Sequence, residues 1–315
     1  MFIISIDIGG TKVCGGIVQK IADKNWQCIK YIQEPTKKGK QNLFQQVKSI
    51  VNRLKNDHTN LINLIIGMPG YFPKNVISPG SAKQLGMYEK EFDNLNVLDF
   101  FQAILSDKDK TFVINDAKLQ SIGAFFQHKK NEQISNKALN TVMYIGIGTG
   151  LGGSVINFKL DSIHFLTDGQ ISNIILKHCN QEAETLLSSY YISNFTNHSA
   201  LEISENKNLL SKYEHIFTNM GNNLAELIIQ IKQQKVHRKN ELQSWHLKDI
   251  ELLSEINMFL IGGGIGQKGV LSDLIIQKAK KILKNKGYND CCLVPIQKSA
   301  RTALVAGGYF FEYCC

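Results

Sequence analysis

Two glycine-rich turns contain the residue types that bind phosphate groups. The first turn contains Gly9, Gly10, Thr11 and Lys12, and the second contains Gly148, Thr149 and Gly150. Glycine lets backbone N–H groups approach a polyanion closely, and a hydroxyl and a cation both suit phosphate oxygens. Either turn alone could equally be an ordinary β-hairpin. Together, the two turns predict a nucleotide held between two similar lobes.

A candidate catalytic carboxylate follows an apolar, strand-like run at residues 111–114. Asn115 and Asp116 stand where that strand ends and a helix begins. Ligands in α/β proteins bind at the carboxyl ends of strands, and a carboxylate there can accept the proton of an attacking sugar hydroxyl. The helix dipole would keep Asp116 ionised. The alternative interpretation is a helix N-cap, for which Asn and Asp are preferred residues.

A third glycine segment begins with Gly262, Gly263 and Gly264. With Gly266 and Gly269 it matches the G-x-G-x-x-G pattern of dinucleotide-binding folds. The chain that follows is too short for a complete dinucleotide-binding half, so we interpret this turn as a support for an adenosine. A P-loop nucleotide site is excluded because no G-x-x-x-x-G-K-[ST] occurs.

The apolar patterning predicts the elements that position these residues. Strands are expected at residues 2–6, 13–18, 26–32, 61–67, 111–114, 256–261 and 291–295, with a strand, turn and strand over 141–156. Helices are expected at residues 43–54, 117–126, 186–195, 209–235, 270–284 and 300–313. Because both halves begin with a strand, a glycine turn and a strand, we expect a duplicated β-sheet core.

Composition limits the class of protein. The chain has 315 residues, of which 43% are hydrophobic and 20% charged, which fits two ordinary globular domains. No apolar run reaches the roughly 20 residues of a membrane span, and no signal peptide is evident, so we expect no membrane association and a cytoplasmic location. The net charge of +9 comes from dispersed lysines, with small clusters at residues 37–40, 129–130 and 278–286. This distribution favours anionic substrates over a nucleic-acid surface.

The cysteine pattern indicates neither a disulfide framework nor a zinc finger. The seven cysteines form no C-x-x-C pair, and an odd number without a framework is typical of a reducing compartment. His178 and Cys179 are two adjacent metal-ligand types without a nearby second pair, so we expect no zinc site.

These motifs, taken in order along the chain, resemble those of the ROK family of sugar kinases and repressors, within the actin/hexokinase-like superfamily. The matching segments are residues 6–12, 66–70 (I-G-M-P-G), 115–117 (N-D-A), 146–153 and 262–264. The resemblance implies an α/β, two-lobed actin-like ATPase (ribonuclease H-like) fold with an interlobe cleft. It places a small lobe at residues 1–116 plus 299–315 and a large lobe at residues 117–298. It also implies a homodimer.

The resemblance also implies roles for individual residues. Asp116 would be the catalytic base, and the sugar would be bound by Asn115, Asp116, Glu184, Gln170 and Asn173. The phosphates of ATP would lie on Gly9, Gly10, Thr11, Lys12, Gly148, Thr149 and Gly150, and its adenosine on Gly262, Gly263 and Gly264. Asp7 would orient Mg²⁺ through water.

The chain departs from the family pattern in the segment that precedes Glu184. Where the family usually has Glu-x-Gly-His, this sequence has Gln170 and Asn173, and the zinc loop is reduced to residues 177–179. We therefore expect an ATP-dependent hexose kinase, acting on the 6-hydroxyl of glucose or a related hexose that can be N-acetylated. A catalytically weak sugar-sensing or scaffold protein is the alternative. The hexose, and the choice between ATP and polyphosphate, stay open.

Overall fold

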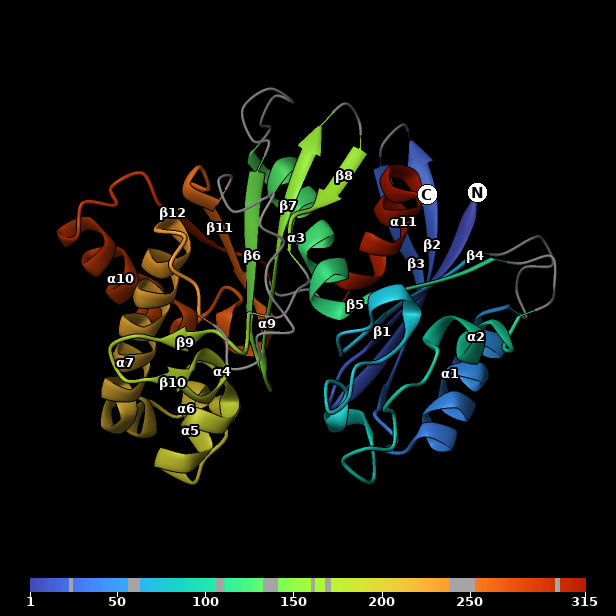
Figure 1. Cartoon of the computed structure of the whole chain (residues 1–315), viewed down its shortest axis with the longest axis horizontal. Helices are drawn as coiled ribbons and strands as arrows, with labels where there is room; N and C mark the ends of the chain where they lie inside the picture. Colours follow the sequence, from blue (N-terminus) through green and yellow to red (C-terminus); the bar gives the residue numbers. More distant parts are fainter. Residues whose placement is uncertain are drawn as a thin grey trace. The chain divides into compact units, whose positions relative to one another are not determined.

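The computed structural model describes residues 1–22, 25–55, 63–105, 110–132, 141–159, 162–167, 171–237, 253–297 and 301–315. The chain forms two compact units (Figure 1). Unit 1 comprises residues 1–127, 161–163 and 299–315, and unit 2 comprises residues 128–160 and 164–298. The expected boundary at residue 116 lies at the start of helix α3 (Asp116–Glu132), whereas the division into compact units falls after Gln127.

Unit 1 is built on a five-stranded mixed sheet. Its strands are β1 (Phe2–Ile8), β2 (Lys12–Ala22), β3 (Asn25–Pro35), β4 (Asn63–Met68) and β5 (Lys110–Asn115), in the order β3-β2-β1-β4-β5. β1, β2 and β3 are antiparallel neighbours, whereas β1, β4 and β5 run parallel. The carboxyl ends of the three parallel strands therefore meet at one edge, which brings Asp7, Gly67 and Asn115 together.

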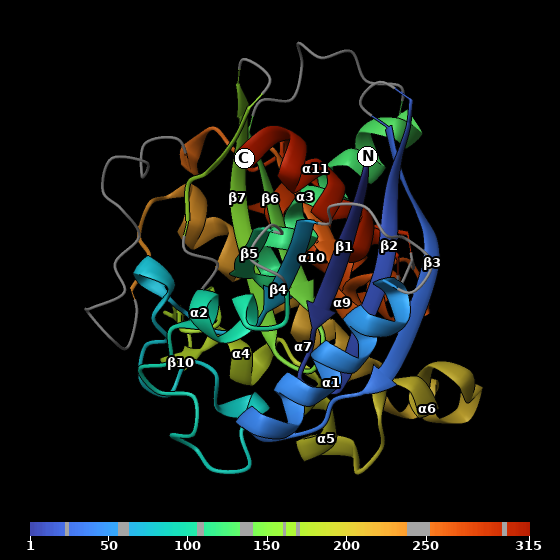
Figure 2. The same ribbon diagram turned by 90° about the vertical axis from the view of Figure 1, so that its right-hand side faces the viewer.

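Helices cover both faces of the first sheet. Ile50 of α1 (Lys40–Lys55) lies against Gly15 of β2, and Leu304 of α11 (Thr302–Cys314) lies against the next residue, Gly16. Successive strand residues point to opposite faces, so α1 and α11 flank the sheet on its two sides (Figure 2). The smaller α2 (Val97–Gln102), η1 (Pro73–Asn75) and η2 (Lys83–Leu85) complete the unit.

Unit 2 repeats the strand order of unit 1. Its sheet contains β6 (Thr141–Ile147), β7 (Leu151–Lys159), β8 (Ser162–Phe165), β11 (Met258–Gly262) and β12 (Cys292–Pro295), in the order β12-β11-β6-β7-β8. In both sheets the first strand lies between the second and the fourth, and the third and fifth form the edges. This arrangement confirms the expected duplication of the core. A two-stranded ribbon, β9 (Ile175–Leu176) and β10 (Gln181–Glu182), stands apart from the sheet.

The helices of unit 2 follow the predicted order with one correction. The helices whose bounds the structure describes are α4 (Ala183–Leu186), α5 (Ser189–Thr196), α6 (Ala200–Glu205), α7 (Lys207–Lys232), α9 (Gly263–Gly266) and α10 (Val270–Asn285). The long helices α7 and α10 pack against each other (Figure 1). The helix expected over residues 186–195 is divided in two. Leu187 (φ −131°, ψ 42°) ends the first helix, and Ser188, with an extended backbone (φ −141°, ψ 173°), precedes the second.

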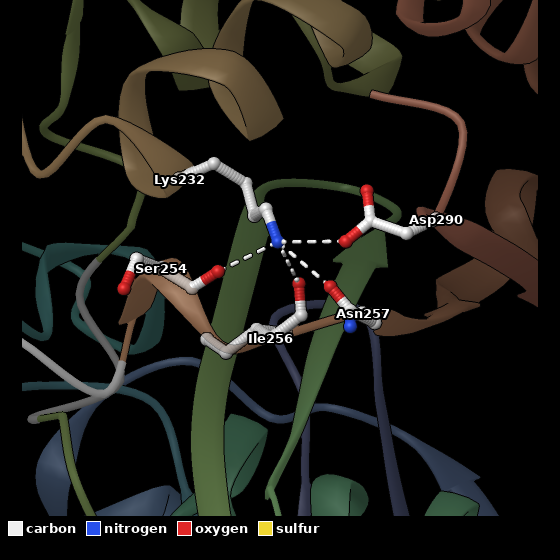
Figure 3. Close-up of polar contacts among 5 residues, drawn as sticks. All are labelled: Lys232, Ser254, Ile256, Asn257 and Asp290. Carbon is white, nitrogen blue, oxygen red and sulfur yellow. Dashed lines mark hydrogen bonds and ion pairs between the residues drawn. The ribbon is translucent and has the colours of Figure 1, made fainter. Parts of the chain in front are cut away.

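A nearly buried lysine fixes the start of β11 (Figure 3). The ammonium of Lys232, at the end of α7, donates to the carbonyl oxygens of Ser254 (2.6 Å) and Ile256 (3.1 Å) and to Asn257 Oδ1 (2.7 Å). It also lies 3.4 Å from Asp290 Oδ2. The last residue of β11 is Gly262, so this cluster anchors the strand that carries the third glycine segment.

Within the described part of the chain, no helix has both the length and the apolar character that crossing a membrane requires.

Candidate active site

The first glycine turn joins β1 to β2. The Gly9 N–H donates to the carbonyl oxygen of Lys12 at 2.8 Å and closes the hairpin, while Thr11 and Lys12 are exposed. The carbonyl oxygen of Thr11 accepts from the N–H of Thr36, just after β3. The backbone of the turn is thus fixed from one side, and its hydroxyl and ammonium are free to meet an anion.

Two carboxylates lie beside this turn. Burial raises the pKa of Asp7 to about 6, against the lowering effects of a Gln120 hydrogen bond and the Lys12 charge. Burial and the neighbouring Asp7 charge raise the pKa of Asp116 to about 7, although the Ala117 N–H donates to its Oδ1 at 2.9 Å. The helix N-terminus therefore does not keep the pKa of Asp116 at its ordinary low value in the ligand-free protein. Desolvation and the second carboxylate outweigh the helix N-terminus.

Gly67 has no side chain, and this lets the start of α3, which carries Asp116, lie close to the sheet that contains Asp7. Gly67 pairs with Asp7 on one side and with Ile114 on the other, so it lies between β1 and β5. A Cβ atom on Gly67 would lie 2.7 Å from Leu119 Cδ2 and 3.6 Å from the Asp116 Cα. A side chain at position 67 would require the buried Leu119 of α3 to move, so the sequence of β4 helps to set the position of α3 and Asp116.

Asn115 caps α3 and also ties down a neighbouring loop. Its Oδ1 accepts from the Lys118 N–H at 3.2 Å, as in the N-cap interpretation. Its Nδ2 donates to the Gly70 carbonyl oxygen at 3.0 Å. The side chain is buried, so it joins the I-G-M-P-G segment to the helix that carries Asp116.

The second glycine turn, in unit 2, lies next to Glu184. The Gly148 N–H donates to the Gly150 carbonyl oxygen at 2.9 Å, and the Ser189 N–H donates to the Gly148 carbonyl oxygen at 2.8 Å. Glu184 Oε2 accepts from the Leu151 N–H at 3.3 Å. The carboxylate predicted to bind sugar therefore touches the turn predicted to bind phosphate.

The third glycine segment packs on the second turn. Gly263 has a φ of +79°, and a Cβ atom there would lie 2.4 Å from the Ile147 carbonyl oxygen. The Gly264 N–H lies beside Gly148, at 3.4 Å from where a Cβ of Gly148 would be. Unit 2 thus brings the expected adenosine turn and the expected phosphate turn into contact.

The remaining predicted residues divide into two groups. Asn173 follows Ser172, whose carbonyl oxygen accepts from the Glu184 N–H at 3.1 Å, so this segment adjoins Glu184. Gln170 lies outside the described residues. Among the residues that are described, no group of three or more His, Cys, Asp and Glu side chains could hold a metal ion.

Three residues contribute to this geometry in ways that the sequence did not indicate: Lys38, Gly67 of the I-G-M-P-G segment, and Gln120. Partial burial lowers the pKa of Lys38, whose ammonium reaches the first turn. Lys38 belongs to a lysine cluster that the sequence shows only as positive charge. Gln120 follows Asp116 by one helical turn, a spacing that could have indicated a shared face but not its contact with Asp7.

The match to a family model decides the relationship. A model of the ROK family matches residues 3–161. The chain belongs to the ROK family. The matched segment includes the first glycine turn, the Asn115-Asp116 pair and the second glycine turn. A search of curated proteins by sequence found no match.

Solved structures show the same fold as this ROK chain. A Streptomyces griseus ROK glucokinase, in complex with glucose and AMPPNP, has 17% identity and a TM-score of 0.65, with 98% of each chain covered. A Listeria monocytogenes protein described as a candidate N-acetylmannosamine kinase has 17% identity and a TM-score of 0.66, with 99% of each chain covered. An Arthrobacter polyphosphate/ATP-glucomannokinase has 17% identity and a TM-score of 0.59, also with 99% of each chain covered. These similarities confirm the expected α/β fold of the actin-like ATPase type.

Proposed function

We propose that this ROK protein is an ATP-dependent kinase that phosphorylates the 6-hydroxyl of glucose or a related hexose, N-acetylated hexoses included. The observation that carries the proposal is the pairing of Asp116 and Asp7 beside the first glycine turn. Asp116 is a carboxylate with a pKa of about 7, which suits a general base at neutral pH. Membership of the family and the fold of known sugar kinases support the same activity.

Asp116 would accept the proton of the 6-hydroxyl as its oxygen attacks the terminal phosphorus of ATP. Phosphoryl transfer depends on positioning and on neutralising charge, so the backbone N–H groups of the two glycine turns would bind the phosphate oxygens. The Glu184 carboxylate and the side chains of Asn115 and Asn173 would accept and donate hydrogen bonds to sugar hydroxyls. We assign Gly262, Gly263 and Gly264 to the adenosine.

Asp7 fits the role of orienting a magnesium ion. Its Oδ1 is buried and has no hydrogen-bond partner among the described residues. Mg²⁺ in nucleotide enzymes is held by one or two carboxylates together with waters and phosphates, so a single carboxylate is sufficient. The ion, when bound, would neutralise the phosphates and the negative charge shared by Asp7 and Asp116.

The test is ADP release by the purified full-length protein with Mg-ATP and each of glucose, mannose, fructose, N-acetylglucosamine and N-acetylmannosamine. We expect one sugar to stimulate release, its 6-deoxy analogue not to do so, and Asp116→Asn to lose about 100-fold or more in turnover. Unchanged turnover in Asp116→Asn would remove this residue from the mechanism.

A catalytically weak, sugar-binding protein is the second candidate. The neutral amide of Asn173 favours it, because the family resemblance leads us to expect an ionisable group there. Binding of Mg-ATP and of a sugar without sugar-stimulated ADP release would support this candidate over the kinase.

A further inference from the structure

Three carbonyl oxygens of the first glycine turn are held by one short segment, residues 36–38. The Gly9 carbonyl oxygen accepts from Thr36 Oγ1 at 2.7 Å, and the Thr11 carbonyl oxygen accepts from the Thr36 N–H at 3.1 Å. The Gly10 carbonyl oxygen, between them, accepts from the Lys38 ammonium at 2.6 Å. Three consecutive peptide oxygens are therefore engaged on the side of the turn that faces this segment.

This arrangement determines what the turn can offer to a ligand. A phosphate group repels carbonyl oxygens and is attracted by N–H groups, so an anion-binding turn must keep its carbonyls directed elsewhere. The glycines at positions 9 and 10 give the turn many alternative conformations. Contacts that hold the carbonyls remove those alternatives before the anion arrives, and such preorganisation increases affinity.

Within the part of the chain that the structure describes, Lys38 is the one side chain of this segment that also reaches a second loop. Its ammonium donates to the carbonyl oxygen of Gln84 in η2, and the side chain of Gln84 lies next to Gly10. The following residue, Gly39, contacts the same loop: its N–H donates at 2.9 Å to the carbonyl oxygen of Leu85, which follows Gln84. An ammonium has three donors, and Lys38 uses two of them in these contacts among the described residues.

We propose that Lys38 is a positioning residue for the phosphoryl donor, which holds the Gly10 carbonyl away from the phosphates and presents the N–H groups of the first turn to them. The proposal rests on the proposed kinase function. Its neighbour Lys37 provides a matched control, because Lys37 is exposed and its side chain donates no hydrogen bond within the described residues. Both lysines contribute the same charge to the same region, but only Lys38 contacts the turn.

The experiment compares Lys38→Met, Lys38→Arg and Lys37→Met in the full-length protein. Affinity for Mg-AMPPNP and for adenosine is measured by calorimetry, which needs no turnover, and thermal melting verifies folding. We expect Lys38→Met to weaken Mg-AMPPNP binding at least fivefold and adenosine binding less than twofold. Lys38→Arg should recover most of the affinity, and Lys37→Met should bind as the wild type does. In turnover, the KM for ATP should rise while the KM for the sugar is unchanged.

Equal affinities in Lys38→Met and the wild type would overturn the proposal, and so would equal losses in Lys38→Met and Lys37→Met, which would indicate only general charge. Equal losses of affinity for Mg-AMPPNP and for adenosine would also overturn the proposal. Adenosine has no phosphates, so such a result would mean that Lys38 supports the whole fold and not the phosphate-binding turn. A wild-type protein that does not bind Mg-AMPPNP would contradict the proposed kinase itself. The failure of the two proposals can thus be distinguished.

Discussion

Asp7 and Asp116 are two carboxylates of unit 1 with raised pKa values. Asp7 lies in β1, and Asp116 begins α3 directly after β5. Burial raises the pKa of both groups, and the charge of Asp7 raises the pKa of Asp116 further. The proposed kinase function accounts for such a pair, because perturbed carboxylates are typical of functional sites. The cost of ionising these two carboxylates should be measurable as a loss of folding stability when no ligand is bound.

We expect Asp116→Asn to stabilise the metal-free protein, and to do so more at pH 8 than at pH 5. The pKa of Asp116 is raised from 3.8 to about 7, so the folded state binds the proton more tightly than the unfolded state. Wild-type stability therefore falls as the pH rises through this range, by about 1.4 kcal/mol for each unit of pKa elevation. The neutral amide removes the contribution of Asp116 to this pH dependence.

The measurement is the melting temperature in EDTA at both pH values, with Asp273→Asn, an exposed carboxylate on α10, as the control. A stabilisation by Asp116→Asn that is equal at pH 5 and pH 8 would contradict the explanation.

At the scale of elements, the start of α3 depends on one glycine of β4. We expect Gly67→Ala to lower turnover at least tenfold in a protein that still folds, because the added Cβ would meet Leu119 Cδ2 at 2.7 Å and displace Asp116. Steady-state kinetics of Gly67→Ala and of the double variant Gly67→Ala/Leu119→Ala test this. The second substitution removes the clashing atom and should restore part of the loss. If the double variant is no faster than Gly67→Ala, the clash is not the cause.

The contacts of Lys232 lead to a prediction that concerns the stability of the protein and not its activity. We expect Lys232→Met to lower the free energy of unfolding by about 2–4 kcal/mol, because two carbonyl oxygens and an amide oxygen lose a charged donor. Asp290→Asn should cost about 1 kcal/mol or less, since the Asp290 side chain is 55% exposed. Urea denaturation of the two variants compares these costs. A larger effect of Asp290→Asn would show that the ion pair dominates.

At the scale of the whole molecule, unit 1 is completed by the last helix of the chain. Helix α11 buries Ala303, Leu304, Ala306, Tyr309 and Tyr313, and Tyr309 stacks on Phe126 of α3 with ring centroids 3.8 Å apart. Burying a large apolar side chain contributes about 1.5–3 kcal/mol, and the net stability of a typical protein is only about 5–15 kcal/mol.

We therefore expect a chain truncated after residue 301 to lose the cooperative thermal transition of unit 1. Removal of Cys315 alone, an exposed residue, is the control and should have no effect. Calorimetry of both chains makes the comparison, and a truncated chain that melts at the wild-type temperature would refute the dependence on α11.

Sequence reasoning predicted the local features of this molecule better than the long-range ones. Glycine turns and alternating apolar residues indicated both β-hairpins, because a hairpin is defined by adjacent residues. The contact between Gln120 and Asp7, and the reach of Lys38 to Gly10, depend on how strands pair and helices pack across many intervening residues. The break at Ser188 was missed because the apolar pattern continues through it. The role of Glu184 came from resemblance, not from spacing.

The docking of α11 has a consequence for spectroscopy. The indole of Trp26 is buried beneath this helix, and its Nε1 donates to Glu312 Oε2 at 2.6 Å. The chain has two tryptophans, and the other, Trp245, lies outside the described residues. In a Trp245→Phe protein, the fluorescence of Trp26 would report whether the C-terminal helix is seated on the sheet, with a red shift as it detaches.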